Sequence, residues 1–330
     1  MKNFEYAQPQ KLKEVFQYLD EPNTVIKAGG IDLLDLMKED LLSPKRVVNI
    51  GNISELKFIR ENKDASISIG PNVTLNELAD NEIIAKYFPA LNEAAKLIAT
   101  PQIRNSATIG GNLCQRPRCW YFRSADFDCS RKGGSHCFAL FGENKYHAIL
   151  GAQNGCAIVQ PSGIAVPLMS LNAILVISDG ENIKHLNLSE FYIDPAMDIT
   201  KETILTKNEV IVEIIIPSEM RKYKNHYIKL KEKESFDWPL ADVAVALKLN
   251  GLLCESANII LGSAAPIPWK SKEAEFELVG KNVTKELARI AGESSMREAY
   301  SLGDNKYKIQ LFKVVVYRAI CQVMGINPNE

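Results

Sequence analysis

The sequence lacks a strong charge of either sign, a long apolar run and an apolar leader. Its 330 residues carry a formal net charge of −1, with lysine and arginine spread along the whole length. This balance gives no basic surface for nucleic acid or for an anionic membrane. The longest apolar stretch, Ile158–Ile177, is interrupted by polar residues and prolines. We therefore expect neither a nucleic-acid partner nor a membrane span.

Residues 1–16 mix acidic and basic side chains and contain no apolar segment typical of a secretory signal. We therefore expect a cytoplasmic protein, and reduced thiols fit that compartment. A periplasmic location would require export together with a partner that carries a signal.

Two common nucleotide-binding motifs are also missing, because neither G-x-G-x-x-G nor G-x-x-x-x-G-K-S/T occurs. The sequence shows no persuasive Ser/His/Asp or Cys/His constellation that would activate a substrate. A stand-alone flavin oxidase would need such a base, so the sequence disfavours that class.

Cysteine is concentrated in one stretch. Five of the seven cysteines lie between Thr108 and Cys156, at positions Cys114, Cys119, Cys129, Cys137 and Cys156. The residues between them include Arg116, Arg118, Arg123, Asp126, Asp128, Arg131, Lys132, Gly133 and Gly134, which are typical of a loop and would not bury thiols in an apolar core. Disulfides at this density belong to small secreted domains, whereas this chain is long and we expect no secretory leader. A metal is the better explanation for the clustering.

The spacing from Cys119 to Cys156 is C-x9-C-x7-C-x18-C, without the paired knuckles of structural zinc sites, although Cys114-x4-Cys119 comes close. An iron–sulfur cluster tolerates wider loops. The residues alone favour a cluster and leave zinc or structural thiols as alternatives. His136 and His147 flank this loop, and we interpret both as hydrogen-bonding residues rather than ligands.

A strand, a glycine turn and a helix follow one another near the N-terminus, around Gly29 and Gly30. This order brings several free backbone N–H groups to one point, which suits a pyrophosphate, although ordinary turns have the same pattern.

Hydrophobic periodicity predicts the other elements. We expect helices at residues 11–20, from 31, 74–86, 91–99, from 284 and 305–324, and strands at residues 24–28, 47–50, 66–70, 147–150, 157–159, 173–177, 210–216, 227–230, 243–249 and 256–262. Asp179-Gly180 indicates a hairpin. The polar segment 216–225 is the best candidate for a domain boundary.

Three stretches together carry a family resemblance. Residues 27–34 (KAGGIDLL), 104–113 (RNSATIGGNL) and 261–269 (LGSAAPIPW) resemble the FAD-binding medium subunit of xanthine dehydrogenase-type molybdenum hydroxylases. The resemblance implies an α+β fold with a two-part FAD-binding domain at 1–219, made of a small N-terminal α/β lobe and a larger α+β lobe. A C-terminal α+β domain of antiparallel sheet and helices would occupy 220–330.

The cysteine loop narrows the resemblance. It is similar to the loop in flavoprotein subunits of bacterial aldehyde oxidoreductases that carry a [4Fe–4S] cluster, and less so to the flavoprotein subunit of 4-hydroxybenzoyl-CoA reductase. This similarity implies an insertion at about 113–156 with the ligands Cys119, Cys129, Cys137 and Cys156, whereas Cys114 is not required.

The resemblance also implies which residues contact FAD. The expected cofactor-binding residues are Lys27, Ala28, Gly29, Gly30, Ile31, Asp32, Leu33, Leu34, Thr108, Gly111, Asn112 and Lys229. The first eight would cradle the pyrophosphate through their backbone, and Lys229 could equally be an exposed charge on an edge strand. Two positions depart from the family: Ile31 replaces a hydroxyl residue, and Gly163 stands where relatives often carry aspartate.

The implied function is electron transfer within a complex that oxidises a substrate such as an aldehyde. The expected partners are a large subunit with molybdenum cofactor and a small subunit with [2Fe–2S] clusters. The final acceptor, whether ferredoxin, quinone or NAD, is left open. The alternatives are a subunit like that of 4-hydroxybenzoyl-CoA reductase and a zinc-stabilised binding module without redox chemistry.

Overall fold

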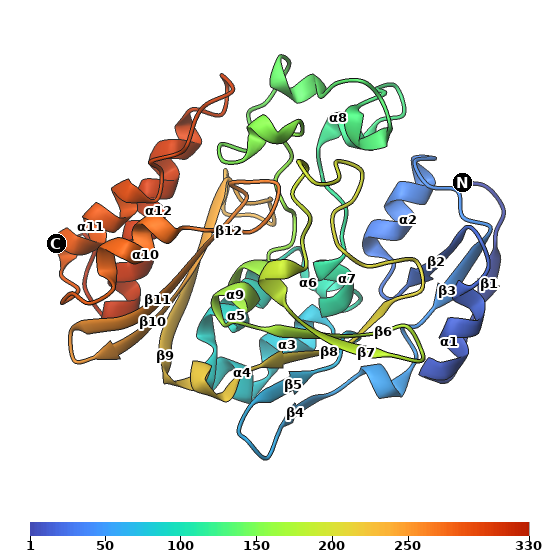
Figure 1. The fold of residues 1–330 in the computed structure, drawn as a ribbon, viewed down its shortest axis with the longest axis horizontal. Coiled ribbons are helices and arrows are strands. Elements are labelled where there is room, and N and C mark those ends of the chain that lie inside the picture. Colours follow the sequence, from blue (N-terminus) through green and yellow to red (C-terminus); the bar gives the residue numbers. More distant parts are fainter. Residues whose placement is uncertain (330) are drawn as a thin grey trace.

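A computed structural model describes residues 1–329, in which the strands form three separate sheets (Figure 1). Glu330, the last residue of the expected C-terminal domain, lies outside the described residues. No helix within residues 1–329 is long and apolar enough to cross a membrane.

The small N-terminal lobe contains a parallel sheet of order β1-β3-β2. Its elements are β1 (Glu5–Ala7), α1 (Leu12–Leu19), β2 (Thr24–Lys27), α2 (Ile31–Lys38) and β3 (Arg46–Asn49). Each helix connects two strands of the same sheet, as parallel pairing requires. Val15 and Leu19 of α1 pack against Val48 of β3 in the core of this lobe. The expected α/β lobe is therefore present.

The larger lobe is built on an antiparallel sheet of order β4-β5-β8-β6-β7. Its strands are β4 (Ile59–Glu61), β5 (Ile67–Ile69), β6 (Ile174–Ser178), β7 (Ile183–Asn187) and β8 (Val210–Ile216). The helices of this part are α3 (Leu75–Asp80), α4 (Glu82–Tyr87), α5 (Pro89–Leu97), α6 (Pro101–Arg104), α7 (Ile109–Leu113) and α9 (Ala165–Ser170). The hairpin expected at Asp179-Gly180 joins β6 to β7, which confirms that prediction.

One expected helix is two helices. The pattern at 74–86 predicted a single helix, but Asn81 has an extended backbone (φ −77°, ψ 122°) between α3 and α4. Asn81 Oδ1 accepts a hydrogen bond from Ile84 N at 3.1 Å, so this residue ends one helix and caps the next. The capping box expected at Thr74 and Glu77 is present, with Thr74 N donating to Glu77 Oε2 at 2.9 Å.

The prediction of strands at residues 147–150 and 157–159 is wrong. Both segments are buried but irregular, and they pair only through isolated contacts. Ala148 N donates to Ala157 O at 2.9 Å, and Ile149 N donates to Ala264 O at 2.8 Å. Their apolar residues reflect burial against the C-terminal domain, which a short apolar run cannot distinguish from a strand.

The C-terminal domain has an antiparallel sheet of order β12-β11-β10-β9, with helices against it. Its elements are β9 (Tyr223–Leu230), β10 (Ala241–Asn250), β11 (Leu253–Gly262), β12 (Trp269–Lys270), α10 (Lys272–Leu278), α11 (Lys285–Ser294) and α12 (Tyr307–Met324). Phe312, Val315 and Ile320 of α12 are fully buried in the core of this domain. The architecture confirms the expected α+β class.

The segment from Cys114 to Cys156, here called the cysteine insertion, is mostly irregular, with α8 (Trp120–Arg123) and short 3-10 turns. It lies along one edge of the molecule, at the top of Figure 1, with α8 on the side of α2. Cys129 and Phe122 pack there against Leu36 of α2. The insertion thus rests on the helix that follows the Gly29-Gly30 turn.

Candidate cofactor sites

The two glycine turns expected to bind FAD lie against each other. Gly29 faces the backbone of Ser106 and Ala107 so closely that an added Cβ would overlap Ser106 O and lie 3.2 Å from Ala107 Cα. Only glycine permits this approach. The chain therefore brings residues 27–34 and 104–112, which are far apart in sequence, to one place.

The helix that follows this turn presents free donors. Gly30 has a left-handed backbone (φ 79°) and caps α2, and the first helical bond runs from Leu34 N to Gly30 O at 3.0 Å. The backbone N–H groups of Ile31, Asp32 and Leu33 find no acceptor among residues 1–329. Such N–H groups favour an anion.

The side chain of Lys27 folds back over its own turn. Its Nζ donates to Ala28 O at 3.0 Å and to Asn49 Oδ1 at 3.3 Å. Partial burial lowers the pKa of Lys27. The ammonium group of Lys27 therefore stabilises the turn. Only the backbone of Lys27 is expected to contact the cofactor.

Asp32 also has a structural role. Its carboxylate accepts hydrogen bonds from Arg116 N at 2.9 Å and from Arg123 Nη2 at 2.7 Å, and it lies 3.3 Å from Arg118 Nη2. The side chain thus ties the start of the cysteine insertion to the first turn of α2. Only the backbone of Asp32 remains for the expected cofactor contact.

The second turn is capped by Thr108, whose Oγ1 accepts a hydrogen bond from Gly111 N at 3.1 Å. An added Cβ at Gly110 would lie 2.7 Å from Pro71 Cβ, so protein packing requires that glycine. At the exposed Gly111, the added atom would meet only Thr108 Oγ1, at 3.0 Å. Packing within the protein explains why position 110 is a glycine. It explains Gly111 less well, and a ligand lying close to the backbone would account for that glycine.

Asn112 joins this turn to the segment that departs from the family pattern. Its Oδ1 accepts from Ser162 Oγ at 2.8 Å and from Ile164 N at 3.3 Å, so only its Nδ2 is left for a cofactor. Between these two partners, an added Cβ at Gly163 would lie 3.1 Å from the side chain of Ile98. Ile98 thus fills the space beside Gly163.

Lys229 reaches the same region from β9. Its Nζ donates to Leu97 O at 2.9 Å, and its strand position pairs with Asp242 of β10. Burial lowers the pKa of Lys229. Tyr227 of the same strand donates from its hydroxyl to Asp242 Oδ2 at 3.0 Å. Lys229 therefore lies on an edge strand, as expected if it were an exposed charge and not a cofactor contact. Its ammonium group, however, donates a hydrogen bond to the protein.

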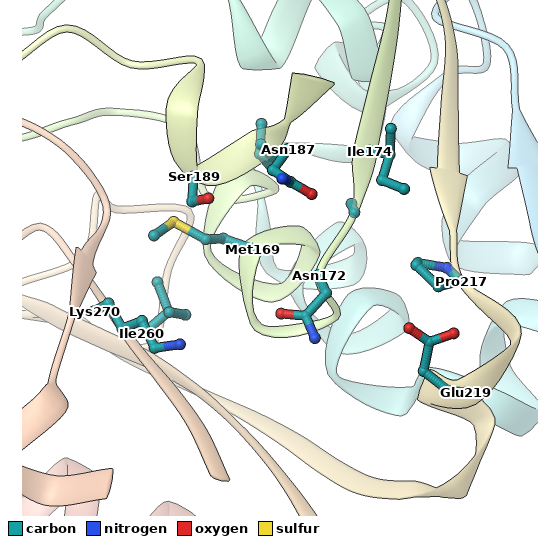
Figure 2. Close-up of a pocket in the computed structure, with 11 residues that line it drawn as sticks. Met169, Asn172, Ile174, Asn187, Ser189, Pro217, Glu219, Ile260 and Lys270 are labelled. Carbon is teal, nitrogen blue, oxygen red and sulfur yellow. The ribbon is translucent and has the colours of Figure 1, made fainter. Parts of the chain in front are cut away.

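A separate pocket of about 350 Å³ lies between the larger lobe and the C-terminal domain (Figure 2). Met169, Asn172 and Ser189 line one side, and Ile260 and Lys270 line the other. None of the residues expected to bind FAD lines this pocket. It is therefore distinct from the two glycine turns.

The surroundings of four thiols in the cysteine insertion differ from those of the fifth. Cys129, Cys137 and Cys156 are at most 8% exposed and Cys119 is half-buried. Cys114 is exposed as a residue, but its thiol is buried, which raises the pKa of Cys114 to about 12. The four lie close enough to influence one another: the interaction with Cys156 lowers the pKa of Cys137, and Cys119 interacts with the charges of Cys129 and Cys156. Cys114 instead interacts with Tyr192.

Hydrogen-bond donors lie beside three of these four sulfurs, those of Cys119, Cys137 and Cys156. Burial raises the pKa of Cys119 to about 11, and the interaction with Cys137 together with burial raises the pKa of Cys156. Backbone N–H groups at Tyr121, Phe122 and Ile158 act against these shifts, and those at Ala139 and Ala157 help to lower the pKa of Cys137. His147 Nε2 lies 3.2 Å from Cys119 Sγ, as expected of a hydrogen-bonding histidine. Arg131 Nε donates to Cys156 Sγ at 3.5 Å. Such donors are typical around the sulfurs of iron–sulfur clusters.

Within residues 1–329, no group of three or more His, Cys, Asp and Glu side chains is spaced to bind a metal ion. The structure therefore supports neither a zinc site nor a cluster among the described residues, and the [4Fe–4S] cluster stays a prediction.

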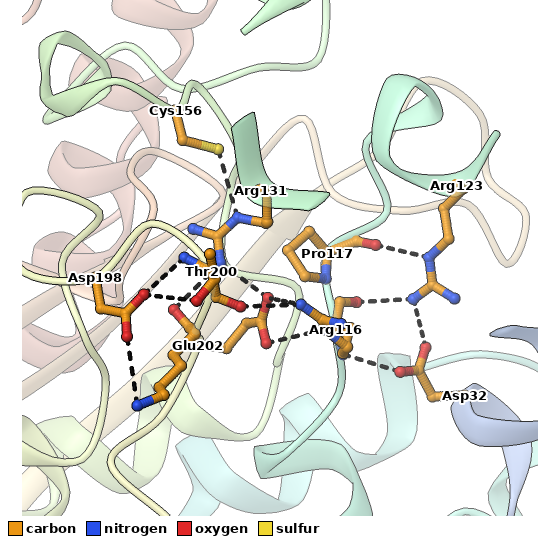
Figure 3. A network of polar contacts seen from close by, with 10 residues as sticks. Asp32, Arg116, Pro117, Arg123, Arg131, Cys156, Asp198, Thr200 and Glu202 are labelled. Carbon is orange, nitrogen blue, oxygen red and sulfur yellow. Dashed lines mark hydrogen bonds and ion pairs between the residues drawn. The ribbon is translucent and has the colours of Figure 1, made fainter. Parts of the chain in front are cut away.

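Sequence reasoning missed Arg131 and Glu202 as parts of this site. Arg131 Nη1 donates to Glu202 Oε1 at 2.8 Å, and Arg116 Nε donates to Glu202 Oε2 at 3.0 Å (Figure 3). The arginines stood out only as polar loop residues. No local signal points to Glu202, because it follows Arg131 by 71 positions.

Comparison with known proteins decides the family. Residues 2–219 match the family described as the FAD binding domain in molybdopterin dehydrogenase, and residues 225–323 match the CO dehydrogenase flavoprotein C-terminal domain. The chain belongs to the FAD-binding medium subunits of the molybdenum hydroxylases. The family expected from the three motif stretches is confirmed, and with it a role as an oxidoreductase subunit that binds FAD.

Individual relatives cover nearly the whole subunit. The chain is 30% identical to the aldehyde oxidoreductase FAD-binding subunit PaoB of Escherichia coli K12, over 88% of this chain and 89% of that protein. It is also 30% identical to the carbon monoxide dehydrogenase medium chain of Hydrogenophaga pseudoflava, over 96% of each chain. A solved carbon monoxide dehydrogenase from the same organism matches with a TM-score of 0.76 at 26% identity, over 98% of each chain.

Proposed function

We propose that this chain is the electron-transfer subunit of a heteromeric molybdenum hydroxylase that oxidises an aldehyde. The observation that carries the proposal is the contact between the Gly29-Gly30 turn and the Ser106–Asn112 turn, with the free N–H groups of α2 beside it. The similarity to an aldehyde oxidoreductase subunit supports the aldehyde class. Carbon monoxide dehydrogenase and 4-hydroxybenzoyl-CoA reductase chemistry are outcomes that assays of the complex would distinguish.

The FAD would be held mainly by backbone. The donors of residues 27–34 would bind the pyrophosphate, and Thr108, Gly111, Asn112 and Lys229 would contact the rest of the cofactor. FAD supplies the ability to take electrons singly and to release them one or two at a time. This ability suits a position between a partner with [2Fe–2S] clusters and an external acceptor, whether ferredoxin, quinone or NAD.

Cys119, Cys129, Cys137 and Cys156 would hold a [4Fe–4S] cluster as a further one-electron centre. Three of these thiols are buried, and backbone or side-chain N–H groups point at the sulfurs of Cys119, Cys137 and Cys156. Those donors are what anionic cluster thiolates need in a buried site. We also propose that the FAD-binding domain ends at residue 219 and that the C-terminal domain begins at residue 220.

Substrate activation would take place in a partner with molybdenum cofactor. We therefore expect the native chain to purify with a large subunit that carries this cofactor and a small subunit that carries [2Fe–2S] clusters. If the chain instead purified alone and reduced its own flavin with a small substrate, the proposal would be wrong.

The direct test of the FAD assignment is Gly111→Val. The branched side chain would occupy the space above the backbone of α7, so flavin content should fall strongly while the flavin-free protein keeps its fold. The control is Gln322→Val, which places the same side chain on an exposed position of α12. Absorbance at flavin wavelengths and circular dichroism would be measured on both. Unchanged flavin in a folded Gly111→Val protein would refute the assignment of this turn.

A further inference from the structure

Arg131 places a buried positive charge beside one of the four clustered thiols. The residue is 3% exposed, and its Nε donates to Cys156 Sγ at 3.5 Å (Figure 3). Burying a guanidinium is costly unless it is paired. Its position next to a thiol therefore calls for a compensating negative charge.

Glu202 provides part of that compensation and shares it with a second arginine. Its Oε1 accepts from Arg131 Nη1 at 2.8 Å, and its Oε2 accepts from Arg116 Nε at 3.0 Å. Arg131 Nη1 also donates to Lys201 O at 3.2 Å. One carboxylate thus serves two guanidinium groups, so positive charge remains in excess beside Cys156.

The other cationic side chains of the insertion point elsewhere. Arg118 and Arg123 pair with Asp32, Lys132 donates to Ser124 O, and Lys145 pairs with Glu232. Among the residues described, Arg131 is the charged side chain that hydrogen-bonds a cysteine. His147 also contacts a cysteine, with its Nε2 3.2 Å from Cys119 Sγ, but a guanidinium carries a permanent charge whereas an imidazole does not.

We propose that Arg131 raises the reduction potential of the cluster held by the four cysteines, and that Glu202 limits this effect. The inference rests on the proposed function, since it requires the cluster. Reduction adds one electron to a group whose thiolates are already negative. A fixed cation in a buried site stabilises the reduced form more than the oxidised form. Arg131 is thus a positioning residue for electron transfer.

The test compares variants whose expected shifts have opposite signs. Arg131→Gln removes the cation and should shift the midpoint potential of the cluster to a more negative value. Glu202→Gln removes the anion that offsets the cation and should shift the potential to a more positive value. Arg131→Lys keeps the charge and should shift it less than Arg131→Gln. Arg116→Gln is the matched control, because Arg116 pairs with Glu202 but does not touch a cysteine, and its shift should be the smallest.

The measurement is a dithionite titration of the FAD-loaded protein, purified anaerobically and followed by low-temperature EPR. The flavin midpoint, read by absorbance in the same titration, serves as the internal reference and should stay constant. If Arg131→Gln loses iron, the Glu202→Gln shift decides the question. Equal cluster potentials in wild type, Arg131→Gln and Glu202→Gln, or shifts of the same sign in the two variants, would overturn the inference. Absence of iron and sulfide in the unmutated protein would overturn the proposed cluster itself.

Discussion

Arg123 Nη2 donates to Asp32 Oδ1 at 2.7 Å, although the two residues are 91 positions apart in the sequence. Asp32 belongs to the first turn of α2, next to the Gly29-Gly30 turn, and Arg123 ends α8 in the cysteine insertion. The Gly29-Gly30 turn and the cysteine insertion therefore share an anchor, which would bring the two proposed redox centres near each other.

Replacing Asp32 should loosen the insertion. Asp32→Ala leaves Arg123, which is 12% exposed, without its shorter ion pair, and it also removes the acceptor of Arg116 N. The expected loss is about 1.5–3 kcal/mol, the range for hydrogen bonds to charged groups. Limited proteolysis should show faster cleavage within residues 113–156. The control is Asp35→Asn, since Asp35 is 48% exposed and its pair with Arg123 should contribute less than about 1 kcal/mol. Equal cleavage rates in the two variants would contradict this role of Asp32.

The two glycine turns should respond differently to substitution. Gly29→Ala places a methyl group against Ser106 O, a backbone atom that cannot move aside, so the flavin-free protein should lose about 1–3 kcal/mol of stability. Gly111→Ala meets only Thr108 Oγ1 and should keep most of its stability. Urea unfolding of both flavin-free proteins measures the difference. A Gly29→Ala protein as stable as wild type would show that the turns are not in close contact.

The cysteines should separate into two groups. Replacing Cys119, Cys129, Cys137 or Cys156 with alanine should abolish or degrade the cluster, since each would supply one thiolate. Cys114→Ala should leave the iron content nearly unchanged, because Cys114 lies apart beside Tyr192. Iron and acid-labile sulfide assays on the five variants test this expectation. Iron loss in Cys114→Ala but not in Cys156→Ala would reverse the assignment.

Lys308 should make stability depend on pH. It is 1% exposed and donates to Tyr146 O at 3.4 Å and His147 O at 3.1 Å, and burial lowers its pKa to about 7. The unfolded chain, with the ordinary lysine pKa near 10.5, then binds more protons than the folded protein above pH 7. This group therefore makes the free energy of unfolding rise with pH between about 7 and 10.

Removing the buried ammonium should flatten that rise. The free energy of unfolding, measured by urea titration at pH 7, 8 and 9, should increase less with pH in Lys308→Met than in wild type. Lys306→Met is the matched control, because Lys306 is exposed at the start of the same helix and should retain the wild-type slope. The same slope in Lys308→Met and wild type would show that Lys308 is not the responsible group.

Local signals in the sequence predicted much of the fold. The glycine turn before α2, the capping box at Thr74 and the Asp179-Gly180 hairpin depend on neighbouring residues, and all three are present. The break at Asn81 was missed because apolar spacing continues across it, although Asn is a good N-cap residue. The irregular segments 147–150 and 157–159 were misread because their backbones pair with Ala264 and with each other through isolated hydrogen bonds, not with a neighbouring strand.

The candidate site shows the same difference between features that neighbouring residues determine and features that depend on distant residues. The glycine turns and the clustered cysteines could be found from spacing, because each group is continuous or dense in the sequence. The residues that form hydrogen bonds around these groups could not be found from spacing. Glu202 meets Arg131, and Asp32 meets Arg123, only after the chain has folded. Pairs this distant leave no periodic pattern in a single sequence.

The measurement that most directly tests the account is the analysis of FAD, iron and acid-labile sulfide in the unmutated chain, purified without oxygen. The account predicts about one FAD per chain, together with about four iron and four sulfide ions from a [4Fe–4S] cluster. A chain that contains zinc without sulfide, and no flavin, would contradict it.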